Sequence, residues 1–101
     1  MPEFILTYRA RAGYTPGSED AMAAWQKWFD DMGPALADIG KPVFSRTTLG
    51  NCGAGATVLG GYSIIRAGNL ESAAALAKGC PFIDDNGGVE VGELSDLAPR
   101  P

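Results

Sequence analysis

The chain has 101 residues, of which 46% are apolar, and it carries a formal net charge of −4 without a single histidine. This length predicts one domain, and the lack of grouped lysine and arginine argues against a nucleic-acid partner, because phosphate neutralisation requires such groups. Without histidine, the usual general base near neutral pH and the commonest metal ligand are missing. We therefore expect neither a metal site nor a cofactor.

The apolar runs are far shorter than the ~20 residues that cross a bilayer, so no membrane partner is expected. The first residues, Met1-Pro2-Glu3-Phe4, show no basic leader region. A cytoplasmic location is the expectation. Cys52 and Cys80 fit no zinc or redox spacing, and we expect two reduced thiols.

The first half of the chain predicts a strand, a long helix and a second strand. Residues 3–9 alternate as a strand, with Phe4, Leu6 and Tyr8 on one face. Ser18 is the expected helix N-cap and Gly40 the expected C-cap, with a kink or a restart at Gly33-Pro34. Residues 42–49 are the predicted second strand. The apolar stripe of the helix has a 3-4 spacing and comprises Met22, Trp25, Phe29, Met32, Leu36 and Ile39.

The second half repeats this pattern after a glycine-rich connection over residues 50–57. A third strand is predicted over 59–67, and a second helix begins after Asn69 and ends at Gly79. A fourth strand is predicted over 88–94. We expect a single domain over residues 1–95 and a frayed tail over residues 96–101, which contain two prolines.

The order βαββαβ predicts an α+β, ferredoxin-like fold with a four-stranded antiparallel sheet and both helices on one face. The other face would then be bare. Neighbouring apolar pairs such as Ile5-Leu6 and Ile64-Ile65 point to opposite faces, so both faces are predicted to be apolar. An apolar bare face predicts a partner sheet, and hence a homodimer that pairs as a dimeric α/β barrel.

Three segments carry a resemblance to a known family: Leu59-Gly60-Gly61-Tyr62-Ser63-Ile64-Ile65, Cys80-Pro81 at the end of the second helix, and Gly87-Gly88-Val89-Glu90-Val91. In order and spacing they resemble the YCII-related family, over most of the chain. The resemblance implies the ferredoxin-like fold and the barrel-forming dimer.

The functional residues of that family do not carry over. Family members with an enzymatic role look to use a His-Asp pair, and this chain has no histidine. A large branch has Asp-Gly-Pro-Phe before the Gly-Gly-Tyr strand, whereas residues 51–56 here are Asn-Cys-Gly-Ala-Gly-Ala.

A candidate ligand site follows from residue types instead: Tyr8, Arg46 and Tyr62 on strands, with Trp28 on the first helix. An arginine with two phenols suits a small anion or an aromatic acid, although an arginine at such a position more often faces solvent or a cross-strand acid. Trp25 lies on the apolar stripe and is predicted in the core. For Trp28 the sequence leaves three locations open: the edge of the core, a dimer contact and the rim of a pocket.

Three functions remain open. The first, which we favour over the other two, is binding of an anionic or aromatic small molecule without catalysis. The second is a cofactor-free lyase or isomerase, with Tyr8 or Tyr62 as acid/base and Arg46 as anion clamp; the missing histidine weakens it. The third is an interaction module that acts through its dimer surface.

Overall fold

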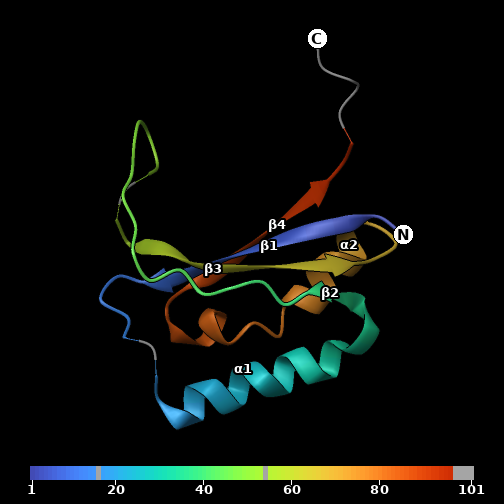
Figure 1. Cartoon of the computed structure of the whole chain (residues 1–101), viewed down its shortest axis with the longest axis horizontal. Helices are drawn as coiled ribbons and strands as arrows, with labels where there is room; N and C mark the ends of the chain where they lie inside the picture. Colours follow the sequence, from blue (N-terminus) through green and yellow to red (C-terminus); the bar gives the residue numbers. More distant parts are fainter. Residues whose placement is uncertain (16, 54, 97–101) are drawn as a thin grey trace.

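A computed structural model describes residues 1–15, 17–53 and 55–96. Four strands form one antiparallel sheet in the order β2-β3-β1-β4, and two helices cover one face (Figure 1). This is the predicted ferredoxin-like βαββαβ fold. The elements are β1 (Glu3–Arg11), α1 (Glu19–Met32), β2 (Leu36–Asp38), β3 (Thr57–Arg66), α2 (Leu70–Ala77) and β4 (Gly88–Leu94), with short 3-10 helices η1 (Gly33–Ala35) and η2 (Pro81–Asp85).

The core lies between the sheet and the helices. Burial alternates strictly along β1, so that Phe4, Leu6 and Tyr8 face the helices while Ile5 and Thr7 face the other side. This is the alternation that the sequence predicts for the first strand. The sheet face without helices is called the open face below.

Both predicted helix starts are confirmed. The Ser18 hydroxyl accepts a hydrogen bond from the backbone N–H of Ala21 at 3.1 Å, and the Asn69 side-chain oxygen accepts one from Ser72 at 2.8 Å. Each cap satisfies one of the N–H groups that a helix start leaves without a partner. Because capping is local, the sequence was sufficient to find it.

The predicted helix is confirmed up to Met32 and is interrupted at Gly33-Pro34 as expected, but its continuation to residue 39 is wrong. Helix α1 ends at Met32, and Gly33 is its C-cap with φ of 54°. Pro34 lies at the start of η1, where its missing N–H is tolerated, and the chain then enters β2. Leu36 and Ile39 therefore fit the 3-4 spacing of the apolar stripe but lie outside helix α1.

The second strand is β2 and not the predicted segment 42–49. Leu36 pairs with Ile65 and Asp38 with Ile64, at the edge of the sheet. Of the predicted strand, Pro42 alone forms a bridge, to Gly61. The backbone of residues 41–43 does continue along the same edge of β3 through hydrogen bonds to Gly60 and Tyr62, but residues 44–49 form no strand.

Gly79 follows the end of the second helix, as predicted, and has a second role as well. Helix α2 ends at Ala77 with Lys78 as its C-cap. A Cβ on Gly79 would lie 2.6 Å from the ring of Trp28, so the glycine leaves room for that indole. The indole N–H of Trp28 donates to the carbonyl of Leu76 at 3.1 Å, which ties α1 to α2.

Of the predicted tail, residues 97–101 lie outside the described residues. No helix within the described part of the chain combines the length and the apolar character needed to span a bilayer.

Candidate functional site

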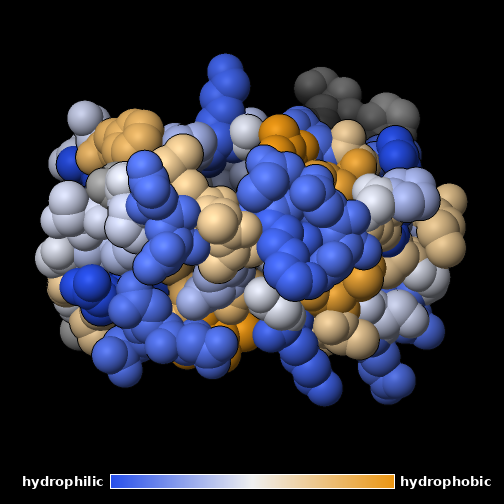
Figure 2. Space-filling model, turned by 90° about the horizontal axis from the view of Figure 1, so that it is seen from below, coloured by the Kyte–Doolittle hydropathy of each residue, from blue (hydrophilic) through white to orange (hydrophobic). Residues whose placement is uncertain are grey.

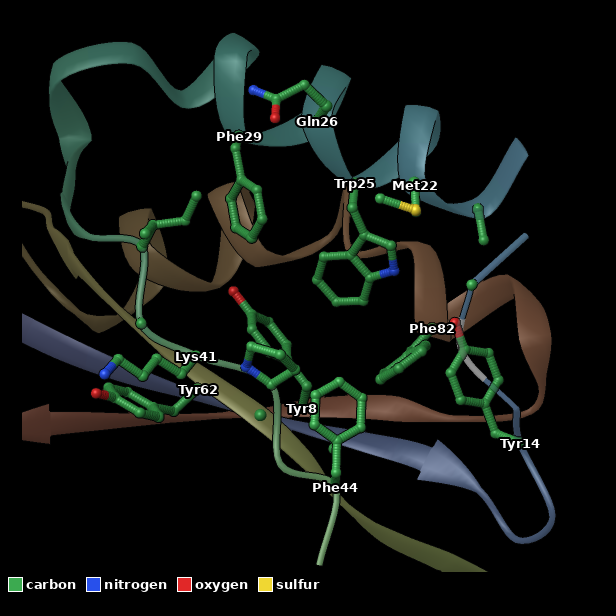
Figure 3. A pocket seen from close by; sticks show the side chains of 17 residues that line it. Tyr8, Tyr14, Met22, Trp25, Gln26, Phe29, Lys41, Phe44, Tyr62 and Phe82 are labelled. Carbon is green, nitrogen blue, oxygen red and sulfur yellow. The ribbon is translucent and has the colours of Figure 1, made fainter. Parts of the chain in front are cut away.

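A cavity of about 350 Å³ lies between α1 and the sheet (Figure 3). Its size is near the lower end of the about 300–1,000 Å³ typical of small-molecule pockets. Figure 2, which looks at the α1 side, shows hydrophobic surface in patches between hydrophilic side chains. All the aromatic residues of the chain except Phe4 and Trp28 line the cavity: Tyr8, Tyr14, Trp25, Phe29, Phe44, Tyr62 and Phe82.

Two glycines of β3 account for the empty space at the sheet. Gly61 pairs with Tyr8, and the register shifts at the next residue of β1, so that Arg9 pairs with Leu59 and Gly60 is the extra residue of a bulge. A Cβ on Gly60 would lie 3.0 Å from the Phe82 ring. The cavity therefore meets bare backbone at a place where any other residue would present a side chain.

Helix α1 supplies the opposite wall. The Trp25 ring stands edge-on to the ring of Tyr8 at 4.8 Å and to that of Phe82 at 4.9 Å, measured between ring centroids. Phe29 lies 5.7 Å from Trp25 along the same helix. Edge-to-face contacts are favourable because the positive edge of one ring meets the negative face of the other. These contacts hold the rings in place around the cavity.

The hydroxyl of Tyr8 is committed to the core. It donates to the Ser63 hydroxyl at 2.7 Å, and Ser63 donates to the carbonyl of Ile39 at 2.6 Å. Burial raises the pKa of Tyr8 well above its usual range, and nearby Cys80 adds to the rise, although the bond to Ser63 opposes it. Tyr8 therefore stays neutral and presents its ring to the cavity.

Residues 39–46, called the strap below, close the cavity beside the edge of β3. The N–H of Tyr62 donates to the carbonyl of Lys41 at 3.3 Å, and the N–H of Val43 donates to the carbonyl of Gly60 at 3.1 Å. The Arg46 guanidinium donates to the carbonyls of Val43 and Leu59. Phe44 reaches the cavity from the strap although 70% of its surface is exposed.

The four residues expected at a ligand site are divided by the structure. Tyr8 and Tyr62 line the cavity. By register Tyr62 lies opposite Thr7, so its ring is directed to the open face, away from Trp25 and Phe29, and runs beside Lys41 (Figure 3). Trp28 is 7% exposed, packs in the core and does not line the cavity. Arg46 is exposed and also lies outside the lining.

The two tryptophans exchange the roles expected for them. Trp25, predicted in the core, is partly buried and forms part of the cavity wall. Trp28, left open by the sequence, is the more buried of the two and packs against α2. Their spacing of three places both near one helix face, and the position of α2 decides which of them is covered.

Sequence reasoning missed the lining residues of irregular segments, above all Tyr14, Lys41 and Phe44. Within the part of the chain that the structure describes, Lys41 is the one charged residue that lines the cavity. The Gly40-Lys41-Pro42 sequence is the signal that could have found it, because glycine and proline mark a fixed turn. Within residues 1–15, 17–53 and 55–96, no three potential metal-ligating side chains gather at one place.

No family model matches the chain, and no curated protein matches its sequence. Among solved structures, the chain is similar to 5-chloro-2-hydroxyhydroquinone dehydrochlorinase (TftG) from Burkholderia phenoliruptrix AC1100, determined in complex with 2,5-dihydroxybenzoquinone. The TM-score is 0.65 at 16% identity, and the match covers 92% of this chain and 93% of that one. At this identity the likeness shows a shared fold over nearly the whole chain.

Proposed function

We propose that this protein binds a small planar ring compound in the cavity between α1 and the sheet. The observation that carries this proposal is that all aromatic residues but Phe4 and Trp28 surround one space of about 350 Å³. An apolar, preformed pocket with few polar groups is the typical site of a small ligand. The ring contacts among Tyr8, Trp25 and Phe82 already exist without a ligand, which lowers the cost of ordering on binding.

The structural neighbour supports the ligand class. A protein of this fold was captured with 2,5-dihydroxybenzoquinone, which is a planar six-membered ring. The resemblance of the Gly60-Gly61-Tyr62 strand to the YCII-related family agrees with this proposal, and we propose membership of that family on the same grounds. A cytoplasmic location remains part of the proposal.

The contacts favour binding over the alternative of a cofactor-free lyase or isomerase. In that alternative, Tyr8 or Tyr62 acts as acid/base and Arg46 holds an anion. The raised pKa of Tyr8 makes it a weaker acid, and its hydroxyl is already hydrogen-bonded to Ser63. Arg46 donates to backbone carbonyls outside the cavity. Tyr62 is therefore the acid/base candidate that remains in this alternative.

The two tryptophans allow a direct test of binding. Hydroxybenzoates, catechol and 2,5-dihydroxybenzoquinone can be screened for binding by titration calorimetry, with tryptophan fluorescence as a second signal. The Trp28→Phe variant still has the Trp25 indole at the cavity, so it should keep the ligand-dependent fluorescence change. Trp25→Phe removes that indole and should lose most of the change. Absence of heat and of any fluorescence change for every compound at millimolar concentration would contradict the proposal.

A homodimer through the open face is part of the same proposal. By register, Ile5 and Ile64 face away from the helices, and Leu59 and Leu94 on that face are 37% and 39% exposed. Glu3 and Arg9 lie on this face toward opposite ends of β1. Glu3 already pairs with Arg66 of the same chain at 3.7 Å, so the apolar character of the face is the ground on which we commit to a second copy with the same face as the occupant.

Sedimentation at micromolar concentration should give a dimer. Ile64→Lys should shift it to the monomer, because it places a charge at the centre of the apolar face. Ala75→Lys, on the exposed side of α2, is the matched control and should leave the dimer unchanged. A wild-type mass of 10.5 kDa would contradict the dimer.

A further inference from the structure

We infer that the cavity selects ring compounds that carry an acidic group, and that Lys41 is the residue that recognises the acid. The inference rests on the proposed function and adds the charge of the ligand to it. Among the described residues that line the cavity, Lys41 is the single charged one, and none is an aspartate or glutamate. The remaining polar tips, on Gln26, Tyr14 and Tyr62, are neutral amide or phenol groups.

The backbone fixes the position of Lys41. Its carbonyl accepts the N–H of Tyr62, and the following Pro42 bridges to Gly61. On the other side, Gly40 has φ of 71°, and its N–H donates to the Asp38 carboxylate at 2.8 Å. The lysine therefore begins at a fixed point on the rim of the cavity.

The ammonium group of Lys41 has no carboxylate partner within the described residues. The ion pairs there involve Arg11, Lys27 and Arg66 instead. The Lys41 side chain is exposed and lies beside the ring of Tyr62, and in this structure both point away from Trp25 and Phe29 (Figure 3). A flexible four-carbon stem can turn the ammonium group toward a ligand, at little cost because no ion pair has to break.

The net charge of the protein and the local charge of Lys41 favour ligands of opposite charge, and the distance over which each acts decides between them. Aromatic cages attract organic cations, and the net charge of −4 favours cations at long range. Screening limits such long-range attraction to about 8 Å at physiological ionic strength. Lys41 acts within the lining itself, where it repels a cation and attracts an anion. The local charge therefore outweighs the global one, and aromatic carboxylates are the ligand class.

Benzoate, benzamide and benzamidine form a test series of similar shape with negative, neutral and positive charge at pH 7. We expect binding by NMR titration in the order benzoate, benzamide, benzamidine, with benzoate ahead of benzamide by about threefold to tenfold. Lys41→Met should remove most of the difference between benzoate and benzamide, and Lys41→Arg should keep it. Raising the salt concentration to 1 M should reduce the difference in the wild type.

Lys78→Met is the control, because it removes the same charge from a residue outside the cavity lining. It should keep the benzoate preference, which separates a local contact from the effect of net charge. Equal binding of the three compounds, or a preference that survives Lys41→Met, would overturn the role of Lys41 and leave ring binding standing. If none of the three binds, the proposed function fails together with the inference.

Discussion

The hydroxyl groups of Tyr8 and Ser63 form a 2.7 Å hydrogen bond between β1 and β3, and Ser63 extends it to the carbonyl of Ile39 in the strap. Ser63 is fully buried, and its bond to Tyr8 is shielded from water, whereas its bond to Ile39 is partly buried. The pair links the ring that forms the base of the cavity to the segment that closes it. Buried polar groups of this kind are costly when one partner is removed.

Ser63→Ala should destabilise the protein more than Tyr8→Phe. The alanine leaves the Tyr8 hydroxyl buried without an acceptor and the Ile39 carbonyl without this donor, which costs about 1–3 kcal/mol. Tyr8→Phe removes the donor and leaves Ser63 bonded to Ile39, so about 0.5–1.5 kcal/mol is expected. Urea denaturation of both variants measures the order. Equal losses would show that the strap does not depend on Ser63.

Trp28→Ala should cost about 3–5 kcal/mol of unfolding free energy, the range for emptying a buried aromatic site. Trp25→Ala should cost about 1–2 kcal/mol, because its ring is partly exposed to the cavity. Denaturant melts of the two variants compare them directly. A larger loss for Trp25 would place it in the core, as the apolar stripe alone predicts, and would contradict the exchange of roles.

Gly40→Ala should destabilise by more than about 2 kcal/mol. The residue has φ of 71°, and a Cβ there would lie 1.8 Å from the carbonyl oxygen of Tyr62. The variant should also weaken ligand binding, since Lys41 and Pro42 would have to move. Gly68→Ala is the control, because its Cβ would meet open space, and it should change stability by about 0.5 kcal/mol or less. Similar melting temperatures for the two variants would contradict the tight contact.

Stability should fall at alkaline pH through Cys80. The thiol is 1% exposed, and burial raises its pKa from 9.0 to about 11. Because the folded-state pKa is the higher one, the contribution is complete below pH 9 and is lost as pH rises toward 11. One pKa unit corresponds to about 1.4 kcal/mol, so a loss of about 1 kcal/mol is expected between pH 8 and 10. Neutral Tyr8 adds a loss of the same sign above pH 10.

Urea melts at pH 8, 9 and 10 measure this loss. Cys80→Ala should flatten the dependence of the unfolding free energy on pH between pH 8 and 10. It also lowers stability at pH 8, because the smaller side chain leaves a small cavity in the core. Cys52→Ala, which removes the exposed thiol, is the control and should keep the slope of the wild type. An unchanged slope in Cys80→Ala would assign the alkaline loss to other groups.

The sequence was sufficient for the features that depend on neighbouring residues. The caps at Ser18 and Asn69, the alternation of β1 and the order of the elements all depend on local patterns. Strand β2 was misplaced because three residues at a sheet edge carry almost no periodic signal, and its position depends on pairing with β3. The end of α1 was misjudged because an apolar spacing continued past Gly33-Pro34.

The cavity was only partly predictable for the same reason. Tyr8 could be placed because strand alternation fixes its direction. Lys41 and Phe44 lie on the strap, whose path depends on hydrogen bonds to β3 that no local pattern encodes. Arg46 looked like an anion site because of its charge, yet its guanidinium is used by carbonyls of Val43 and Leu59.

The bare backbone at Gly60 and Gly61 constrains how this protein can change its ligand over evolution. A Cβ on Gly61 would lie 2.9 Å from the carbonyl of Lys41, and one on Gly60 would meet Phe82 at 3.0 Å. A side chain at either position would have to displace the backbone at Lys41 or the Phe82 ring, so we expect substitutions here to be rare and the depth of the cavity to be kept. New selectivity has to arise at the rim, where exposed Met22 and Phe44 can be exchanged without disturbing the sheet. Relatives with this glycine pair should share one floor and differ in their rims.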